Sequence, residues 1–444
     1  MALGGSAFAA TMACVLLAVL APALSRPASD KKPGSGSHKL LAVTATGTAR
    51  YDDQAILAAS GLELGQPAAE GDLQEAAERL GNSGLFSEVR YSFSYSDAGV
   101  KVEFQLTDVD GSKLVPMRFE NFVWFTEPEL RKLIAQRVPL FKETLPANGR
   151  LTEQISKALQ GILEEKHLPG RVDYLSQGKL EGGDVIGIVY RVLDLTIRIR
   201  NVEFPGASAE EAAFLAAGGR KLAGAEYSRS KLATVAQYDL LPLFLERGYL
   251  KAEFGPADAR VVASSEDRPP DDVEVDAIVP VRPGRKYSVS EVSWKGNSAI
   301  TTLEAAPFFH LTEGEPANAV RLEHDAEELR RLYRSRGYMK ASVAPEAHME
   351  DEKSTVHYVI AIAEGDLYRM GEIEFLGVDS ASKDRLHEAW NLREGQPYNA
   401  DYMKKFLLGA PRLLPKGLDY SMKVDEELNA KDKTVDVTVH FKAK

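Results

Sequence analysis

Two stretches of the chain show strict alternation of apolar and polar residues. In the first, apolar side chains occupy every second position on both sides of a turn at residues 97–99: Val89, Tyr91, Phe93, Tyr95, Val100, Val102, Phe104 and Leu106. The second, near the end of the chain, has the same pattern: Tyr420, Met422, Val424, Val435, Val437, Val439 and Phe441. A period of two residues predicts strands with one buried face, so each stretch is expected to be a β-hairpin.

Helical periodicity precedes the hairpins. Small and apolar residues recur at helical spacing in two segments: Leu73, Ala76, Ala77 and Leu80, and Leu322, Ala326, Leu329 and Leu332. Such stripes predict amphipathic helices that pack one face against a sheet. Ser208 with Glu211 and Thr126 with Glu129 have capping-box spacing, which predicts helix starts.

Three short phrases recur in the same order about every 80 residues. A Gly followed by bulky apolar residues occurs at Gly84, Gly248 and Gly337, with degenerate copies at Lys166 and Gly417. A Leu-x-x-Gly phrase, often continued by Pro, precedes it at Leu62, Leu222 (one residue shorter), Leu311 and Leu392. We expect this phrase to end a first helix and Gly84, Gly248 or Gly337 to end a second. Gly206, Gly296 and Gly377 follow short alternating segments and are expected to form turns after an opening strand.

The order of phrases predicts a repeated β-α-α-β-β unit. The fold class is therefore α+β, with tandem modules in which two helices cover one face of a three-stranded sheet, arranged in an elongated array. The expected units span residues 40–110, 114–195, 196–284, 285–366 and 367–443, and the second is divergent.

At these residues the chain resembles the POTRA (polypeptide-transport-associated) domains of the outer-membrane β-barrel assembly machinery. The resemblance rests on the Arg-Gly-Tyr phrases at residues 247–249 and 336–338 and on the junctions Gly284 to Tyr287 and Gly365 to Tyr368. It spans about residues 40–443 and implies structural roles for the glycines Gly84, Gly248, Gly337, Gly296 and Gly377. The barrel usual in that family is expected to be absent from this chain. A separate barrel protein is therefore a possible partner.

An apolar run at residues 12–24, followed by Ser25, predicts an export signal over residues 1–25 and a flexible leader over residues 26–39. An uncleaved anchor is the alternative, because residues 1–11 contain no Lys or Arg. The only Cys, Cys14, lies inside this signal. We expect an exported, periplasmic protein, and the family resemblance implies association with the outer membrane.

Charge and motif content argue against several functions. Lys and Arg number 54 against 65 Asp and Glu, a net charge of −11, which argues against nucleic-acid binding. No hydrolase, zinc-protease or P-loop motif occurs, so we expect no enzyme, no cofactor, no metal and no small-molecule substrate. His310 and His324 lie in one unit without paired spacing and are predicted to be solvated surface residues.

The remaining candidate for function is the sheet edge. In a β-α-α-β-β unit the last strand tends to be central, which leaves the first hairpin strand at an edge where an extended peptide can add by backbone hydrogen bonds. The candidate residues are Val89, Arg90, Tyr91, Ser92, Phe93, Lys340, Ala341, Ser342 and Val343. The resemblance implies unfolded outer-membrane proteins or envelope proteins as partners, in assembly or transport. A structural adaptor of the cell envelope, in division or wall attachment, is the alternative.

Overall fold

The computed structural model describes residues 37–178, 183–262, 271–415 and 419–443. The predicted export signal, residues 26–36 of the predicted leader and the phrase at Gly417 lie outside these residues. The chain divides into two compact units. Of the described residues, one unit contains those up to 200 together with those in 224–229 and 258–276, and the other contains those in 201–223, 230–257 and 277–443.

Module 1 has the predicted β-α-α-β-β order with one short strand added. Its elements are β1 (His38–Thr46), α1 (Asp53–Ser60), β2 (Pro67–Ala68), α2 (Glu70–Asn82), β3 (Phe86–Ser96) and β4 (Gly99–Asp108). The predicted stripe Leu73, Ala76, Ala77 and Leu80 is the buried face of α2. Because β1 begins at His38, the last two residues of the predicted leader belong to a strand.

Module 2 follows after the 3₁₀ turn η1 (Gly111–Lys113). Its elements are β5 (Leu114–Phe119), α3 (Glu127–Ala135), β6 (Thr144–Pro146), α4 (Leu151–Glu165), β7 (Arg171–Gly178) and β8 (Val185–Leu193). The helix α3 begins at the predicted capping box of Thr126 and Glu129. Buried residues of modules 1 and 2 form one continuous hydrophobic core, and the hydroxyl of Tyr51 in module 1 donates to the carbonyl of Leu140 in module 2 at 3.0 Å.

Module 3 is the most irregular. Its elements are β9 (Thr196–Glu203), α5 (Ala209–Leu222), α6 (Arg229–Val235), the π-helical turn η2 (Ala236–Leu240), α7 (Leu241–Leu245), β10 (Glu253–Phe254), β11 (Asp258–Val261), β12 (Asp272–Ile278) and β13 (Val281–Arg282). The helix α5 begins at the predicted capping box of Ser208 and Glu211. The π turn ends two residues before Pro242, which has no backbone N–H to donate into the preceding turn.

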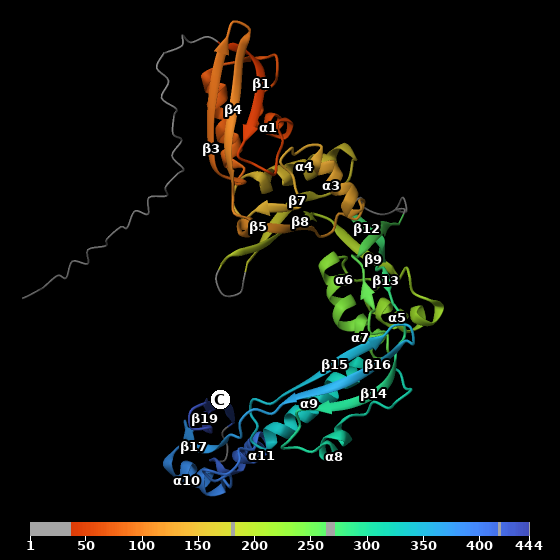
Figure 1. Ribbon diagram of the computed structural model, residues 1–444, viewed down its shortest axis with the longest axis vertical. Coiled ribbons are helices and arrows are strands. Elements are labelled where there is room, and N and C mark those ends of the chain that lie inside the picture. The colour runs from red at the N-terminus through yellow and green to blue at the C-terminus, as the bar shows by residue number, and fades with distance from the viewer. Residues whose placement is uncertain (1–36, 179–182, 263–270, 416–418, 444) are drawn as a thin grey trace, which may run out of the picture. The chain divides into compact units, whose positions relative to one another are not determined.

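Modules 4 and 5 repeat the simple pattern. Module 4 contains β14 (Ser288–Lys295), α8 (Thr302–Ala305), η3 (Ala306–Phe308), α9 (Ala319–Ser335), β15 (Ser342–Glu350) and β16 (Thr355–Ala363). Module 5 contains β17 (Arg369–Leu376), α10 (Ser380–Ala389), α11 (Ala400–Gly409), η4 (Ala410–Leu413), β18 (Tyr420–Asn429) and β19 (Thr434–Ala443). In Figure 1, α9 lies along the hairpin of β15 and β16. No helix of the described residues is long and apolar enough to cross a membrane.

In modules 1, 2, 4 and 5 the last strand lies inside the sheet, as the sequence predicts, whereas in module 3 the central strand is β12 and the last strand, β13, pairs only with β10. The sheet orders are β2-β1-β4-β3, β6-β5-β8-β7, β11-β12-β9, β14-β16-β15 and β17-β19-β18. In modules 1, 4 and 5 the opening strand pairs parallel with the last strand, and the hairpin strand pairs antiparallel with it. The mixed α+β class and the tandem arrangement are therefore confirmed.

The Leu-x-x-Gly phrase has a different role from the one we expected. It does not end the first helix of modules 1, 4 and 5, because α1, α8 and α10 end before their phrases begin. Instead, each phrase glycine donates its N–H to a residue of the opening strand: Gly65 to Leu40, Gly224 to Ile199, Gly314 to Val289 and Gly395 to Met370. The phrase therefore pairs with the outer side of the opening strand and covers that edge of the sheet.

Candidate functional site

One edge of each full sheet is formed by a hairpin strand, and these edges are the sites predicted for peptide addition. The strands concerned are β3, β7, β15 and β18, and in module 3 the sheet ends at β11. In modules 1, 4 and 5 the opposite edge carries the phrase described above, followed by β2 or by isolated bridges at Pro316 and Pro397, and in module 2 it pairs with β6, which has no such phrase. Backbone pairing by an added strand is therefore directed to the hairpin side.

The β15 edge in module 4 is obstructed by two residues of the same module, one on α9 and one on β15. Arg330 on α9 donates from Nε to the carbonyl oxygen of Val343 at 3.2 Å, which occupies an acceptor on the side of β15 away from β16. Pro345 has the same strand parity as Val343, so the N–H that would point to that side is missing. The hydrogen bond from Arg330 to Glu323 raises the pKa of the guanidinium, which keeps this cap charged.

Two of the residues predicted for this edge lie elsewhere. The strand β15 begins at Ser342, so Lys340 and Ala341 precede it. Ala341 is buried and donates its N–H to the carbonyl of Tyr338. Lys340 lies over the ring of Tyr368 at the start of module 5, with Nζ 5.8 Å from the ring centre. Ala341 therefore belongs to the turn that follows Gly337, and Lys340 contacts the next module. The strand begins later than the sequence suggests because this turn is longer than expected.

Module 2 has a comparable cap. Gln160 on α4 accepts a hydrogen bond from the N–H of Val172 at 2.8 Å, at the start of β7. Gln160 and Arg330 occupy the same repeat position, seven residues before the helix-ending residues His167 and Gly337. Sequence reasoning missed this position, because the sequence anchor of module 2 is Lys166, one residue before the helix-ending His167, and counting back seven residues from Lys166 gives Leu159.

The corresponding residue in module 1 is Ala77, whose methyl group cannot reach the strand. The predicted residues Val89, Arg90, Tyr91, Ser92 and Phe93 all lie on β3. Val89 is buried, Tyr91 and Phe93 are half-buried, and Arg90 is exposed and paired with Glu88 at 2.6 Å. No further strand pairs with β3 in the part of the chain that the structure describes.

A cleft of about 1170 Å³ runs beside the beginning of β3. Its walls come from α2, from residues 86–89, and from the strands β5, β6 and β8 of module 2. Ala77 and Gly81, one turn apart on α2, line it together with Phe86 and Val89. The edge strand with no cap thus borders this cleft.

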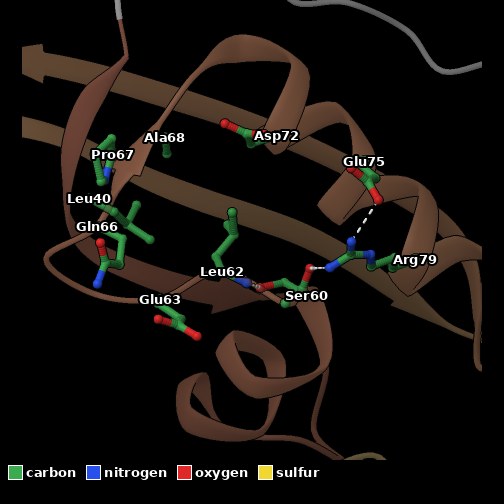
Figure 2. A pocket seen from close by; sticks show the side chains of 11 residues that line it. Leu40, Ser60, Leu62, Glu63, Gln66, Pro67, Ala68, Asp72, Glu75 and Arg79 are labelled. Carbon is green, nitrogen blue, oxygen red and sulfur yellow. Dashed lines mark hydrogen bonds and ion pairs between the residues drawn. The ribbon is translucent and has the colours of Figure 1, made fainter.

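A second, smaller hollow of about 240 Å³ lies between the end of α1 and α2 (Figure 2). Arg79 crosses it, donating from Nη1 to the carbonyl of Ser60 at 3.3 Å and pairing with Glu75 at 2.6 Å. Asp72 accepts from the N–H of Ala69 at the start of α2. These contacts fix the two helices to each other and account for the polar groups of Ser60, Asp72, Glu75 and Arg79.

The predicted anchor glycines lie where modules join. Gly248 accepts a hydrogen bond from the N–H of Tyr287, and Gly337 accepts one from the N–H of Tyr368, both at 2.8 Å. A Cβ at Gly337 would lie 2.6 Å from the carbonyl oxygen of Tyr368, and one at Gly84 would lie 1.9 Å from that of Asn148. Gly296 and Gly377 lie against carbonyls of the last strand of their own modules.

The anchor glycines Gly84, Gly248 and Gly337 end the second helices of their modules with a left-handed turn. Gly337 has φ of 93°, and Tyr338 donates its N–H to Tyr333 while Gly337 donates to Arg334. This pair of bonds is the Schellman motif, and the packed rings of Tyr333 and Tyr338 supply its apolar contact. In module 2, His167 takes the glycine position with φ of 53°.

His310 and His324 are exposed, as predicted, although nothing in the sequence indicated that they share a partner. Both approach Asp325 on α9, whose carboxylate is buried. His310 donates its backbone N–H to Asp325 at 2.8 Å, and its Nδ1 lies 3.0 Å from the same carboxylate. Among the described residues no group of three His, Cys, Asp or Glu side chains is placed to hold a metal ion.

Two segments of the chain match a known family model. Residues 39–108 and 287–365 match the POTRA family model, described as surface antigen variable number repeat. The POTRA3-5 segment of BamA from Haemophilus influenzae is 16% identical, with 56% of this chain and 96% of that chain covered and a TM-score of 0.43. POTRA1-3 of the periplasmic domain of Omp85 from Anabaena is 11% identical, with 92% and 97% covered and a TM-score of 0.20. CdiB from Escherichia coli is 12% identical, with 54% and 36% covered and a TM-score of 0.21.

The family match covers modules 1 and 4, and modules 2 and 5 repeat their strand order and helix order. The segments 39–108 and 287–365 of this chain therefore match the POTRA family model.

Proposed function

We propose that this protein is a periplasmic scaffold that binds extended polypeptides or partner proteins by strand addition, in the assembly or transport of outer-membrane proteins. The observation that supports this proposal most directly is the β3 edge of module 1, which borders a large cleft and has none of the caps found on β7 and β15. Strand addition uses backbone hydrogen bonds and therefore accepts many sequences.

The proposal assigns no catalysis and no cofactor to the protein. Unfolded outer-membrane chains are the proposed ligands, because they expose long extended segments with unpaired backbone groups. A separate barrel protein could receive them. The alternative is an adaptor of the cell envelope that holds division or wall proteins through the same edges.

Site-specific crosslinking tests the proposal. A photoreactive amino acid is placed at Ser92 on β3 in the full chain, with Glu374 on β17 as the matched control, since the β17 edge is bridged to Pro397 at its first residue, Arg369. We expect a urea-denatured outer-membrane porin, diluted into buffer, to crosslink at Ser92 and not at Glu374. Crosslinks in cells to division or wall proteins at Ser92, without crosslinks to outer-membrane chains, would favour the adaptor.

A further inference from the structure

We infer that the cleft beside β3 selects extended segments in which basic side chains alternate with apolar ones. This inference rests on the proposed function, because it specifies the chemistry of the chain that the β3 edge receives. It draws on three features of the cleft: room beside the strand, an apolar floor and an excess of carboxylates.

Room beside β3 comes from small residues on α2. Where modules 2 and 4 place Gln160 and Arg330 against the start of the edge strand, module 1 has Ala77, and Gly81 follows one turn later. A strand that pairs with β3 directs every second side chain to the face that the helices cover. Those side chains would enter the space that Ala77 and Gly81 leave beside the strand.

The floor of the cleft is apolar. Phe86 and Val89 of β3 and Val115 of β5 line it and are buried, and Ile186 of β8 lines it with 46% of its surface exposed. An exposed Ile next to buried apolar residues favours apolar side chains at the positions of the added strand that face inward.

The charged groups of the cleft are mostly acidic. Glu78, Glu88 and Asp184 line it, and Lys113 is the one basic residue among the lining residues of the described chain. Glu88 already pairs with Arg90, while Glu78 accepts a hydrogen bond only from the uncharged Gln74 among its recorded contacts. Carboxylates around an apolar floor complement Lys or Arg side chains and repel Asp and Glu, so charge supplies selectivity where backbone pairing supplies none.

Fluorescence anisotropy with three labelled peptides tests the inference on the full chain. One peptide alternates Val with Lys, one alternates Val with Glu, and the third has the Lys peptide's charges but Pro in place of every Val. We expect the Val-Lys peptide to bind about tenfold more tightly than the Val-Glu peptide at low salt. The Pro peptide should bind weakly, because Pro removes the backbone N–H at every second residue and fixes φ outside the values of a regular strand. Raising the ionic strength should reduce the preference for Lys.

Matched variants locate the effect. The double variant Glu78→Lys with Glu88→Lys should abolish the preference for Lys, while Glu374→Lys with Glu394→Lys, the same change in charge on module 5, should leave it intact. Ala77→Gln, which installs the side chain found in module 2, should weaken the Val-Lys peptide without altering its preference over the Val-Glu peptide. If Ala77→Gln fails to fold, the charge variants still test whether the cleft selects basic side chains.

The outcomes separate this inference from the proposed function. Equal binding of the Lys and Glu peptides, with the Pro peptide still rejected, would leave strand addition standing and overturn the charge selection. A preference for Lys that survives Glu78→Lys with Glu88→Lys would place the selection outside this cleft and overturn it as well. Binding that ignores Pro, or no binding by any of the three peptides, would contradict the proposed function itself.

Discussion

The N–H of Tyr368 donates a hydrogen bond to the carbonyl oxygen of Gly337, with 2.8 Å between the two atoms. The same bond joins Tyr287 to Gly248 one module earlier, also at 2.8 Å. Each glycine therefore has two functions: its positive φ ends the second helix, and its missing side chain lets the first strand of the next module approach. The glycine of each Arg-Gly-Tyr phrase and the Tyr after the next junction therefore form one contact between successive modules.

Replacing Gly337 by Ala should destabilise modules 4 and 5 by about 1–3 kcal/mol, because a Cβ would be forced into a positive-φ conformation and against the carbonyl of Tyr368. Hydrogen exchange checks this. Protection should fall around α9, at the start of β17 and near Tyr398, whose N–H pairs with Tyr368. Protection in modules 1 and 2 should not change.

Gly409→Ala is the control for this substitution, since no atom lies within 4 Å of a Cβ there and its φ is −89°. It should leave stability unchanged or raise it slightly. Equal loosening along the whole chain by Gly337→Ala would contradict the modular organisation, and loosening confined to module 4 would contradict the joint with Tyr368.

His167 provides the converse test in module 2. Its φ of 53° is unfavourable for a residue with a Cβ, and the Schellman bonds from His167 to Glu164 and from Leu168 to Leu163 hold it there. His167→Gly should stabilise the protein by about 0.5–1 kcal/mol in urea unfolding. Lys166→Gly, one residue earlier at φ of −91°, should destabilise it by a similar amount. Stabilisation by both variants would show that the left-handed turn is not the cause.

The sequence was most informative where local chemistry decides the structure. Strand alternation, the stripe on α2 and the capping box at Thr126 and Glu129 depend on neighbours close in the chain, and the structure agrees with each. The prediction that the Leu-x-x-Gly phrase ends a helix was wrong. The partner of the phrase is the opening strand, which is more than twenty residues away in the chain, as with Gly65 and Leu40. The caps on β7 and β15 depend on how far a side chain reaches from a helix to a strand, which spacing alone does not give.

The two junction tyrosines should respond differently to loss of their hydroxyl groups. The hydroxyl of Tyr287 donates to Oδ1 of Asp351 at 2.6 Å, and Lys251 pairs with the same carboxylate at 2.7 Å. Among the described residues the buried hydroxyl of Tyr368 has no partner. Tyr287→Phe should therefore cost about 0.5–1.5 kcal/mol of unfolding free energy, and Tyr368→Phe should be neutral or stabilising. Equal losses in chemical denaturation would contradict the difference.

Asp276 on β12 should make stability depend on pH in the acid range. The hydrogen bonds from Arg200, at 2.9 and 2.6 Å, and from Arg260 lower the pKa of this buried carboxyl group. A lowered pKa in the folded state means that the stabilisation is complete above the unfolded value of about 3.9 and is lost as pH falls through the folded value. Urea unfolding should therefore show that Asp276→Asn is less stable than the wild type at pH 7. The difference in unfolding free energy between the variant and the wild type should narrow below about pH 4. A difference that is constant down to low pH would exclude this carboxylate as the cause.

Removing both obstructions on β15 should create a second edge that accepts peptides. Arg330→Ala frees the carbonyl of Val343, and Pro345→Thr restores an N–H on the same side of the strand, so the edge regains a donor and an acceptor two residues apart. With a photoreactive residue at Glu346, the double variant should crosslink the Val-Lys and Val-Glu peptides, whereas the wild type should crosslink neither. Each single variant should give an intermediate yield, because one obstruction persists in each. Crosslinking by the wild type as strong as that of the double variant would show that Arg330 and Pro345 do not close this edge.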